Sequence, residues 1–377
     1  MPQQDLLEVS DPKALQYIFH TSGYRFPKSR DAIRIADALF GQGLVTVGGN
    51  VHQRQRKILN GSFSASKLRQ FLLIFKSSAS LLTEKLNDQI KGGPGVLNAV
   101  EWTSKVALDI IGMTSFRYRF EALSGGQTEL RDALENGSPT VALSYLSDED
   151  KKKMSNDEIE SQLATFILAG HDTTANAIAW LLYELARHPD DQQRIRGEIR
   201  QVQLSEGALT SNDYDSMPFL NAAIKETLRR HPFVHTLYRM ADQDDILPLS
   251  EPVTTTDGRV ATEILSRKAN LPTVWGDDAD RWNPGRFLGS AEKGQLSLGV
   301  YSNLMTFSAG VRACLGWRFA IMEIQTVTVE LLGNFEFKLP DGVELLDAPG
   351  TLSCLPIVKG KLADGTQVPL QIAPLET

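Results

Sequence analysis

One cysteine lies where the sequence predicts the start of a helix. Cys314 belongs to the stretch F-S-A-G-V-R-A-C-L-G over residues 307–316, and apolar residues recur at helical spacing from Trp317 to Leu332. A thiol at the head of a helix faces unpaired backbone N–H groups and the positive end of the helix dipole. Both favour the thiolate, so we expect a pKa for Cys314 below the usual value of about 8.5.

The neighbours of this cysteine favour a bound ligand. Gly310 and Gly316 place no side chains beside the thiol, so a flat ligand could approach the sulfur and the backbone closely. Arg312 offers a fixed positive charge to an anionic ligand. A thiolate, two glycines and an arginine together predict a binding site for a planar metal cofactor that carries acidic groups.

Taken by themselves, the residues leave other interpretations of Cys314 open. A lone cysteine is most often a small buried apolar residue. A zinc site would need several close ligands, and the sequence has no C-x-x-C and no paired-histidine spacing. A nucleophilic thiol would need a histidine base, which the sequence does not exclude. Cys354 has no evident partner, so the two cysteines favour a reducing compartment over a disulfide framework.

The composition is that of an ordinary globular protein with one large domain or two fused ones. Of the 377 residues, 42% are hydrophobic and 23% are charged, and the net charge is −7. This acidic balance argues against a nucleic-acid partner, which would require a basic surface. No apolar run of about eighteen residues is present, and the first residues do not resemble a signal peptide. We expect a soluble chain without internal repeats.

Helical periodicity dominates the chain, and strand patterns are sparse. Helices are expected over residues 11–20, 66–90, 99–114, 155–187, 189–204, 218–230 and 317–332. Strands are expected over residues 246–256 and in a few pieces after Phe335. The clearest helix begins after Ser155, because Ser155 and Glu158 form a capping-box pattern, and it ends at His188-Pro189. The predicted fold class is mainly α with small β-sheets.

The middle of that long helix, residues 169–174, has the sequence A-G-H-D-T-T. A glycine inside a helix costs about 1 kcal/mol relative to alanine, and an unfavourable local choice often marks a functional position. Gly170 would let a ligand lie against the backbone, Thr173 could hydrogen-bond it, and Asp172 could carry protons inward. A packing glycine with a solvated polar face explains the segment equally well. We expect His171 to point to solvent rather than to a metal.

Two further charged patterns have both an ordinary and a functional interpretation. Glu226 and Arg229 lie three residues apart on one helix face, which is usually a surface pair worth a few tenths of a kcal/mol. Arg286, in the segment W-N-P-G-R-F, could supply a second arginine to Glu226. His52 and Arg56 form a solvated basic patch or, four residues apart, point together at an anionic cofactor.

The order of these segments resembles that of a cytochrome P450. The chain shows H-x-x-x-R, A-G-x-D-T-T, E-x-x-R, P-x-R-F and F-x-x-G-x-R-x-C-x-G in that order. The resemblance runs from Asp11 through the region of Cys354 and is nearest to fungal microsomal members. It implies a single, incomplete cytochrome P450 domain over residues 1–377.

The resemblance implies a role for each matching residue. Cys314 would be the axial thiolate of haem b, with Phe307 packed near the sulfur and Gly310 and Gly316 shaping its loop. The haem propionates would be held by four residues: His52, Arg56, Arg239 and Arg312. Ala169 and Gly170 would line the oxygen pocket, Thr173 would stabilise the activated oxygen, and Asp172 would relay protons. Glu226, Arg229 and Arg286 would form a structural charge trio.

The implied reaction inserts one atom of O₂ into a hydrophobic small molecule, such as a terpenoid or another secondary metabolite. Electrons would come from NADPH through a cytochrome P450 reductase, which would dock near Lys57, Arg54 and Arg318. The chain would act as a monomer. Relatives usually lie at the endoplasmic reticulum membrane. This sequence shows no membrane-anchor helix, so we expect a cytoplasmic or peripheral membrane location.

The chain is shorter than the family pattern in three places. The N-terminal anchor with the first strands, the helices expected within residues 121–154 that would roof the cavity, and part of residues 264–272 have no counterpart. Catalysis needs a site that excludes water. Two functions therefore remain in view, a working monooxygenase and a non-catalytic haem-binding remnant. Isomerase or dehydratase chemistry would usually bring changes around Thr173, which is intact.

Overall fold

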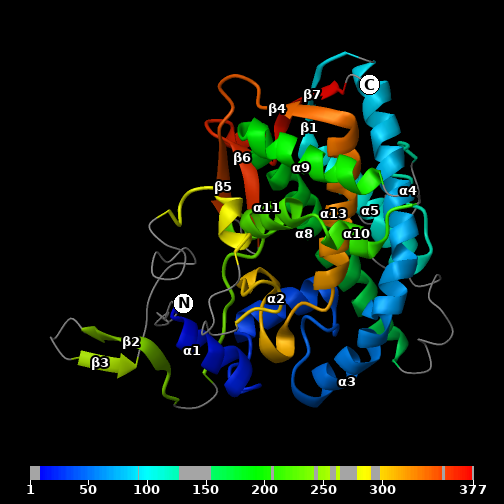
Figure 1. The fold of residues 1–377 in the computed structure, drawn as a ribbon. Helices are drawn as coiled ribbons and strands as arrows, with labels where there is room; N and C mark the ends of the chain where they lie inside the picture. Colours follow the sequence, from blue (N-terminus) through cyan, green and yellow to red (C-terminus); the bar gives the residue numbers. More distant parts are fainter. Residues whose placement is uncertain are drawn as a thin grey trace.

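Long helices make up most of the computed structural model, and small antiparallel sheets lie at its edges (Figure 1). This architecture confirms the predicted fold class. The structure describes residues 9–91, 93–126, 154–204, 208–241, 245–254, 260–263, 278–289, 298–349 and 353–375. The expected loss of roof helices within residues 121–154 and the gap at 264–272 fall almost wholly outside these residues.

The helices agree closely with the expected ranges, and their bounds are α1 (Pro12–Gln16), α2 (Arg30–Phe40), α3 (Gly49–Asn60), α4 (Ala65–Ile90), α5 (Ala99–Ile111), α8 (Asn156–Arg187), α9 (Pro189–Gln203), α10 (Ser211–Asp215), α11 (Pro218–Arg230) and α13 (Trp317–Asn334). Short π-helical turns continue α1 and α5, namely η1 (Tyr17–Thr21) and η3 (Gly112–Phe116). The expected helical ranges did not include α2, α3 or α10. Short 3₁₀ turns complete the set: η2 (Gly61–Phe63), η5 (Pro284–Phe287), η6 (Met305–Phe307), η7 (Gly310–Arg312) and η8 (Leu362–Asp364).

The strands pair in three antiparallel groups. One sheet has the order β1 (Gly95–Asn98), β7 (Pro369–Pro374), β4 (Phe335–Lys338), with Leu97 opposite Leu370 and Phe337 opposite Ile372. β2 (Pro248–Thr254) pairs with β3 (Val260–Glu263), and β5 (Leu345–Pro349) pairs with β6 (Cys354–Val358). The strand expected over residues 246–256 is thus β2.

The capping box predicted for the long helix α8 is present. The Ser155 hydroxyl accepts a hydrogen bond from the Glu158 N–H at 3.2 Å, and the Glu158 carboxylate accepts one from the Ser155 N–H at 3.0 Å. With its 32 residues, α8 spans about 48 Å at 1.5 Å per residue. Its second half, from Thr174 to Leu185, is almost entirely buried. This half anchors the helix, and the first half carries the A-G-H-D-T-T segment.

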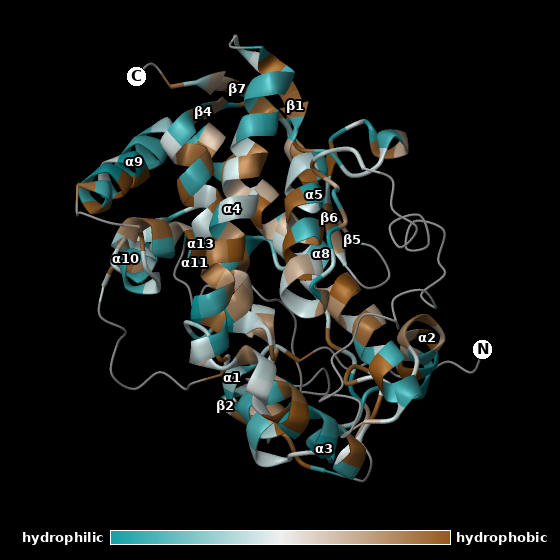
Figure 2. Ribbon diagram, turned by 90° about the vertical axis from the view of Figure 1, so that its right-hand side faces the viewer, coloured by the Kyte–Doolittle hydropathy of each residue, from teal (hydrophilic) through white to brown (hydrophobic). Residues whose placement is uncertain are grey.

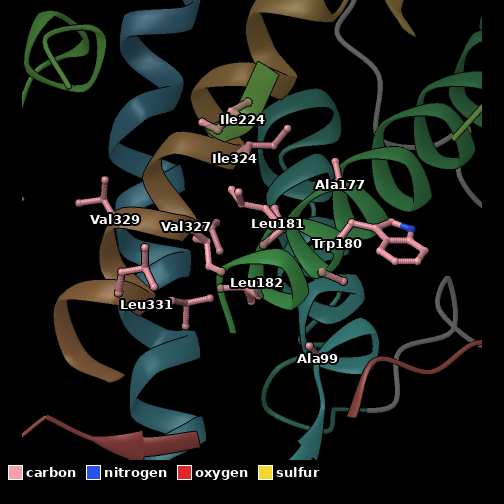
Figure 3. Packing of buried hydrophobic residues seen from close by; sticks show 14 of the residues in the cluster. Ala99, Ala177, Trp180, Leu181, Leu182, Ile224, Ile324, Val327, Val329 and Leu331 are labelled. Carbon is pink, nitrogen blue, oxygen red and sulfur yellow. The ribbon is translucent and has the colours of Figure 1, made fainter. Parts of the chain in front are cut away.

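The core joins α8 to α13, α11, α5 and α4. Figure 3 shows Leu181 and Leu182 of α8 next to Val327 and Ile324 of α13, with Ile224 of α11 beside them. The ring of Phe319 at the head of α13 packs edge-on against Phe75 of α4, with centroids 4.9 Å apart. Burial of such side chains stabilises each by roughly 1.5–3 kcal/mol. The head of α13, directly after Cys314, is therefore held firmly.

The helices at the surface expose their polar faces. Figure 2 shows a largely hydrophilic α9, whose buried residues include Ile195 and Ile199 on its inner face. Within the described ranges, no helix combines the length and apolar character needed to cross a lipid bilayer.

Candidate functional site

A cavity of about 350 Å³ brings together residues that are far apart in the sequence. It lies between the first half of α8, the head of α13, α3 and the segment after α11. Its lining includes ten residues singled out from the sequence, namely His52, Arg56, Ala169, Gly170, Thr173, Arg239, Phe307, Arg312, Cys314 and Gly316. Of the residues predicted to bind the cofactor or to act in catalysis, Asp172 and Gly310 are not part of the lining.

The loop that carries Cys314 is closed by backbone hydrogen bonds. The Cys314 N–H donates to the Phe307 carbonyl at 2.8 Å, and the Ala313 N–H donates to the Gly310 carbonyl at 3.0 Å. The turns η6 and η7 shape the loop, and Gly316 caps α13. The thiol is exposed within the open cavity. This placement excludes the interpretation of Cys314 as a buried apolar residue.

The role expected for Gly310 is wrong. A side chain at Gly310 would not meet a ligand in the cavity, because its Cβ would lie 1.7 Å from the backbone oxygen of Phe19. The residue also has a φ of +62°, a conformation that favours glycine. Gly310 therefore lets the loop pack against η1. Gly316 does line the cavity, as expected.

The pKa expected for Cys314 is also wrong in direction. Dense protein surroundings on the sides away from the cavity raise the pKa of the thiol above its usual value, because burial disfavours the charged form. The Gly316 backbone N–H and the Arg56 charge lower it, but by less. Helix-end effects are therefore outweighed in this structure, and a positive group at the sulfur would be needed to favour the thiolate.

Four basic side chains line one part of the cavity, and within the described ranges none of them forms an ion pair with a carboxylate. These four form the cavity cation cluster: Lys28, Arg56, Arg239 and Arg312. Arg56 and Arg312 donate to the carbonyls of Ala313 and Val47, at 2.7 and 3.1 Å. Like charges brought together without a counterion repel one another, so the cluster calls for an anion.

The cluster changes the ionisation of its members. Burial, together with the charges of Arg312 and Arg239, lowers the pKa of Lys28 to about 8. Burial and Arg312 lower the pKa of Arg239 to about 10. Burial and the neighbouring cations lower the pKa of His52 to about 4, so its ring is neutral at pH 7. A dianionic ligand would relieve this repulsion.

Aromatic rings hold the cluster in place. The Tyr24 hydroxyl is hydrogen-bonded to Nδ1 of His52 at 2.7 Å, and His52 is only 2% exposed. The Arg312 guanidinium lies 5.5 Å from the centre of the Tyr24 ring. That of Arg239 lies 5.1 Å from the centre of the Phe19 ring. When Tyr24 donates to Nδ1, the ring proton of His52 is on Nε2 and can be donated to an acceptor.

The segment A-G-H-D-T-T forms an uninterrupted part of α8. The Thr173 hydroxyl donates to the Ala169 carbonyl at 2.6 Å, and both residues face the cavity. Gly170 also faces the cavity, but a Cβ there would lie 2.8 Å from Cδ1 of Ile111. The glycine is thus required for packing against α5 as well, and the ordinary interpretation of this residue holds beside the functional one.

The expectation that His171 points to solvent is wrong. Its side chain is 21% exposed, with Nδ1 3.1 Å from Oδ1 of Asp172. Burial lowers the pKa of His171, while Asp172 and a hydrogen bond with the Ser104 backbone act in the opposite direction. Packing of α8 on α5 draws the ring inward. Asp172 is 40% exposed and faces away from the cavity lining, where it can exchange protons with water.

The two arginines do converge on Glu226, which is fully buried. Nε of Arg229 lies 2.8 Å from Oε2 of Glu226, and Nε of Arg286 lies 3.1 Å from the same oxygen. The Asn283 N–H donates to Oε1 at 2.9 Å, so the carboxylate also fixes the segment before η5. The surface-pair interpretation of Glu226 and Arg229 is therefore excluded.

Two residues of the site were not found from the sequence, Lys28 and Tyr24. They lie in residues 22–29, which have neither helical nor strand periodicity, so no pattern indicated where their side chains point. Their basic and phenolic side chains gave the only signal. A metal site built from three or more histidine, cysteine or carboxylate side chains is not found in the described part of the chain.

Comparison with known proteins supports the resemblance found from the motifs. The family model described as Cytochrome P450 matches residues 1–141 and 126–362. Cytochrome P450 monooxygenase 81 of Postia placenta is 30% identical over 97% of this chain and 84% of its own length. Ganoderic acid synthetase CYP5150L8 of Ganoderma lucidum is 27% identical over 89% of this chain and 80% of its own length. The first alignment runs over 464 residues, so that relative has many residues without a counterpart in this 377-residue chain.

Proposed function

The chain belongs to the cytochrome P450 family, and we propose that it is a haem-thiolate monooxygenase acting on a hydrophobic small molecule. The observation that carries this proposal is the cavity cation cluster facing the same space as the Cys314 thiol. The residues present fit haem b. They offer a sulfur ligand, four cations without a carboxylate partner in the described residues, and a neutral His52 that can donate to a propionate.

Each group has a distinct task in this proposal. Cys314 would ligate the iron, and Arg56, Arg239, Arg312 and His52 would hold the propionates, with Lys28 as an additional cation. When bound, haem supplies oxygen activation and insertion, which no side chain can perform. The protein supplies the sulfur ligand, the protons and an apolar lining for the substrate.

Two neighbouring residues of α8 are suited to proton delivery. The exposed Asp172 carboxylate can take up a proton from water, and the next residue, Thr173, presents its hydroxyl to the cavity. The Thr173 oxygen donates to the Ala169 carbonyl and keeps its acceptor capacity. We assign proton transfer to the Asp172 carboxylate and Oγ1 of Thr173.

The Thr173→Ala variant tests this assignment. Without the hydroxyl, reducing equivalents should be lost as peroxide, so the product formed per NADPH should fall about a hundredfold, the lower end of the range found for proton-transfer groups. NADPH consumption, peroxide and product are measured together on a panel of apolar substrates. Thr103→Ala is the control. The Thr103 hydroxyl of α5 donates a similar hydrogen bond to the Ala99 carbonyl at 3.0 Å, and Thr103 does not line the cavity. Unchanged coupling in Thr173→Ala would refute the assignment.

The rest of the cavity lining supports an apolar substrate. Phe166, Phe233, Val234 and Leu237 face the space beside Thr173, with Ile111 from α5. Pockets lined by such side chains bind ligands chiefly by removing apolar surface from water. The name of one relative, ganoderic acid synthetase, supports a substrate from secondary metabolism, such as a terpenoid.

A flavoprotein reductase that draws electrons from NADPH is the proposed partner. Of the three cations expected at its docking face, Lys57 and Arg318 are exposed. Arg54 is instead paired with the Glu158 carboxylate at the start of α8, so its charge is partly neutralised. We retain Lys57 and Arg318 as docking residues and withdraw Arg54.

A non-catalytic haem-binding remnant would not need an intact proton-delivery pair. Thr173, Asp172 and the back-bonded Ala169 are all in place, which favours the enzyme. Isomerase or dehydratase chemistry gains no support from the same segment, because Thr173 is unchanged.

A further inference from the structure

His231, the residue after α11, connects three parts of the molecule. Its Nε2 lies 2.9 Å from Oε1 of Glu184 on α8, and its Nδ1 lies 3.0 Å from Oδ2 of Asp347 on β5. The ring stacks on Trp180 of α8, with centroids 3.9 Å apart and planes 6° apart. In Figure 3 the indole of Trp180 projects from α8 on the side away from Val327 and Leu331. His231 is 8% exposed.

The geometry fixes the charge of this histidine. Both ring nitrogens face carboxylate oxygens, and only an imidazolium can donate from both. Burial disfavours the charge, but the hydrogen bonds and charges of Asp347 and Glu184 outweigh it and raise the pKa of His231.

Other basic groups also face Glu184. Arg187 and His188 of the α8 end lie 3.2 and 3.8 Å from its carboxylate, and Arg230 of α11 lies 3.8 Å away. Burial alone would raise the pKa of Glu184, yet the hydrogen bond and charge of His231 and the charges of Arg187 and Arg230 hold it below its usual value. Asp347, which is 37% exposed, forms an ion pair with His231.

The same histidine belongs to the cavity wall. His231 lines the cavity, and so do Phe233, Val234 and Leu237, which follow it in the chain. The β5–β6 hairpin is attached to this segment a second time, because the Cys354 N–H of β6 donates to the Phe233 carbonyl at 2.7 Å. The hairpin and the cavity wall are thus joined at two points, and one of them depends on a charge.

We propose that His231 is a positioning residue for the ligand. As an imidazolium it ties β5 to α8, and this tie holds residues 232–237 in the place where they contact the substrate beside the haem. The inference rests on the proposed function for the nature of the ligand, but the link between Asp347 and residues 232–237 is a property of the chain itself. Losing the tie should loosen residues 232–237 and leave the Cys314 loop intact, because within the described residues no hydrogen bond or ion pair joins Asp347 or residues 232–237 to residues 307–316.

Asp347→Asn is the first test, because it removes one arm of the tie at a partly exposed position and leaves the pair of His231 with Glu184. Glu344→Gln is the matched control on the same hairpin, since Glu344 makes an exposed ion pair with Lys359 at 2.7 Å. Backbone amide hydrogen exchange is measured on the purified chain. Exchange within residues 232–237 should rise at least fivefold in Asp347→Asn and stay unchanged in Glu344→Gln. Equal exchange in the two variants would overturn the proposal, whether or not the protein holds haem.

The second test uses the haem-loaded protein and two probes that bind iron, imidazole and the bulkier phenylimidazole. In Asp347→Asn and His231→Gln, phenylimidazole should bind about fivefold to tenfold more weakly, while imidazole, too small to reach the wall, should bind as in the parent protein. If the affinities for phenylimidazole and imidazole fell by the same factor, the positioning role would be overturned.

The dependence on pH supplies a readout that a purely structural role would not move. In the parent protein the affinity for phenylimidazole relative to imidazole should stay constant below the raised pKa of His231 and fall as pH rises through it. In Asp347→Asn the fall should come at lower pH, because one carboxylate that favours the imidazolium is gone. An identical pH profile for both proteins would contradict the proposal. Absence of a thiolate-haem spectrum in the parent protein would instead refute the proposed function, and the exchange experiment would still decide the role of His231.

Discussion

Two groups of basic side chains in this protein have opposite surroundings. Arg229 and Arg286 converge on Glu226, a fully buried carboxylate that makes ion pairs with both. The cavity cation cluster has more positive charges and no carboxylate partner among the described residues. A buried charge without a partner is costly, so a structure keeps such a cluster only where a ligand brings the counter-charge. The contrast separates arginines that hold the fold from cations that hold a ligand.

Removing the carboxylate of Glu226 should have the largest effect on the free energy of unfolding. Glu226→Gln removes the buried carboxylate that Arg229 and Arg286 share, and Arg286 keeps its pair with Asp278 at 3.1 Å. Breaking such a buried pair costs roughly 3–5 kcal/mol of the free energy of unfolding. Urea unfolding of the purified chain measures this loss. The control is Glu101→Gln, which breaks the exposed pair with Lys105 at 2.6 Å and should cost less than about 0.5 kcal/mol. If both variants lose equally little, the group around Glu226 does not hold the fold.

Removing a cation from the cavity cation cluster should not destabilise the haem-free chain but should weaken haem binding. In Lys28→Met, repulsion with Arg312 and Arg239 disappears, so the haem-free chain should be as stable as the parent protein or more stable. Haem loss should become about fivefold to tenfold faster, because a charge-assisted contact worth roughly 1 kcal/mol is missing. Transfer of haem to excess apomyoglobin measures the rate. The exposed Lys67→Met on α4 controls for the change of charge, and equal rates in both variants would contradict the role of Lys28.

The pH dependence of Lys28 sharpens the same contrast. Its pKa in the folded chain is about 8, below the usual 10.5, so between these values the unfolded chain binds the extra proton. Stability of the haem-free parent protein should therefore rise with pH across that window, relative to Lys28→Met. Unfolding of both proteins at pH 7 and pH 10 measures the difference. A difference that stays constant with pH would mean that Lys28 carries its charge without strain.

Cations outside both groups should have the smallest effect on the fold. Reversing the charge of Lys57 and Arg318 should leave the free energy of unfolding within about 0.5 kcal/mol, since both are exposed. Reductase-driven turnover of the charge-reversed variant should be severalfold slower than that of the parent protein at low salt. The difference should shrink as salt screens the charges. Turnover that is unchanged at every salt concentration would exclude this face as the docking site.

Local patterns were sufficient to predict the long helices and the position of the thiol at the head of one of them. Helical periodicity located α4, α8 and α13, and the pair Ser155 and Glu158 marked the start of α8 to the residue. These features depend on neighbours within a few positions. A contact between Glu226 and Arg286 was offered as one interpretation of the sequence, and the resemblance to cytochrome P450 implied it.

Features that depend on distant contacts could not be predicted. The position of Gly310 is explained by the Phe19 backbone, almost three hundred residues earlier in the chain. The raised pKa of Cys314 depends on the whole surroundings of the thiol rather than on the helix that follows it. Lys28 belongs to the site only because its non-periodic segment folds back against Val45, whose carbonyl accepts a hydrogen bond from the ammonium group.

The central claim is that the Cys314 sulfur and the cavity cation cluster together bind haem. The absorption spectrum of the dithionite-reduced protein under carbon monoxide tests it most directly. The parent protein should show the red-shifted band of thiolate-ligated haem, and Cys314→Ala should lose that band. A parent protein that stays colourless with ample hemin, or shows imidazole-type ligation, would contradict the account.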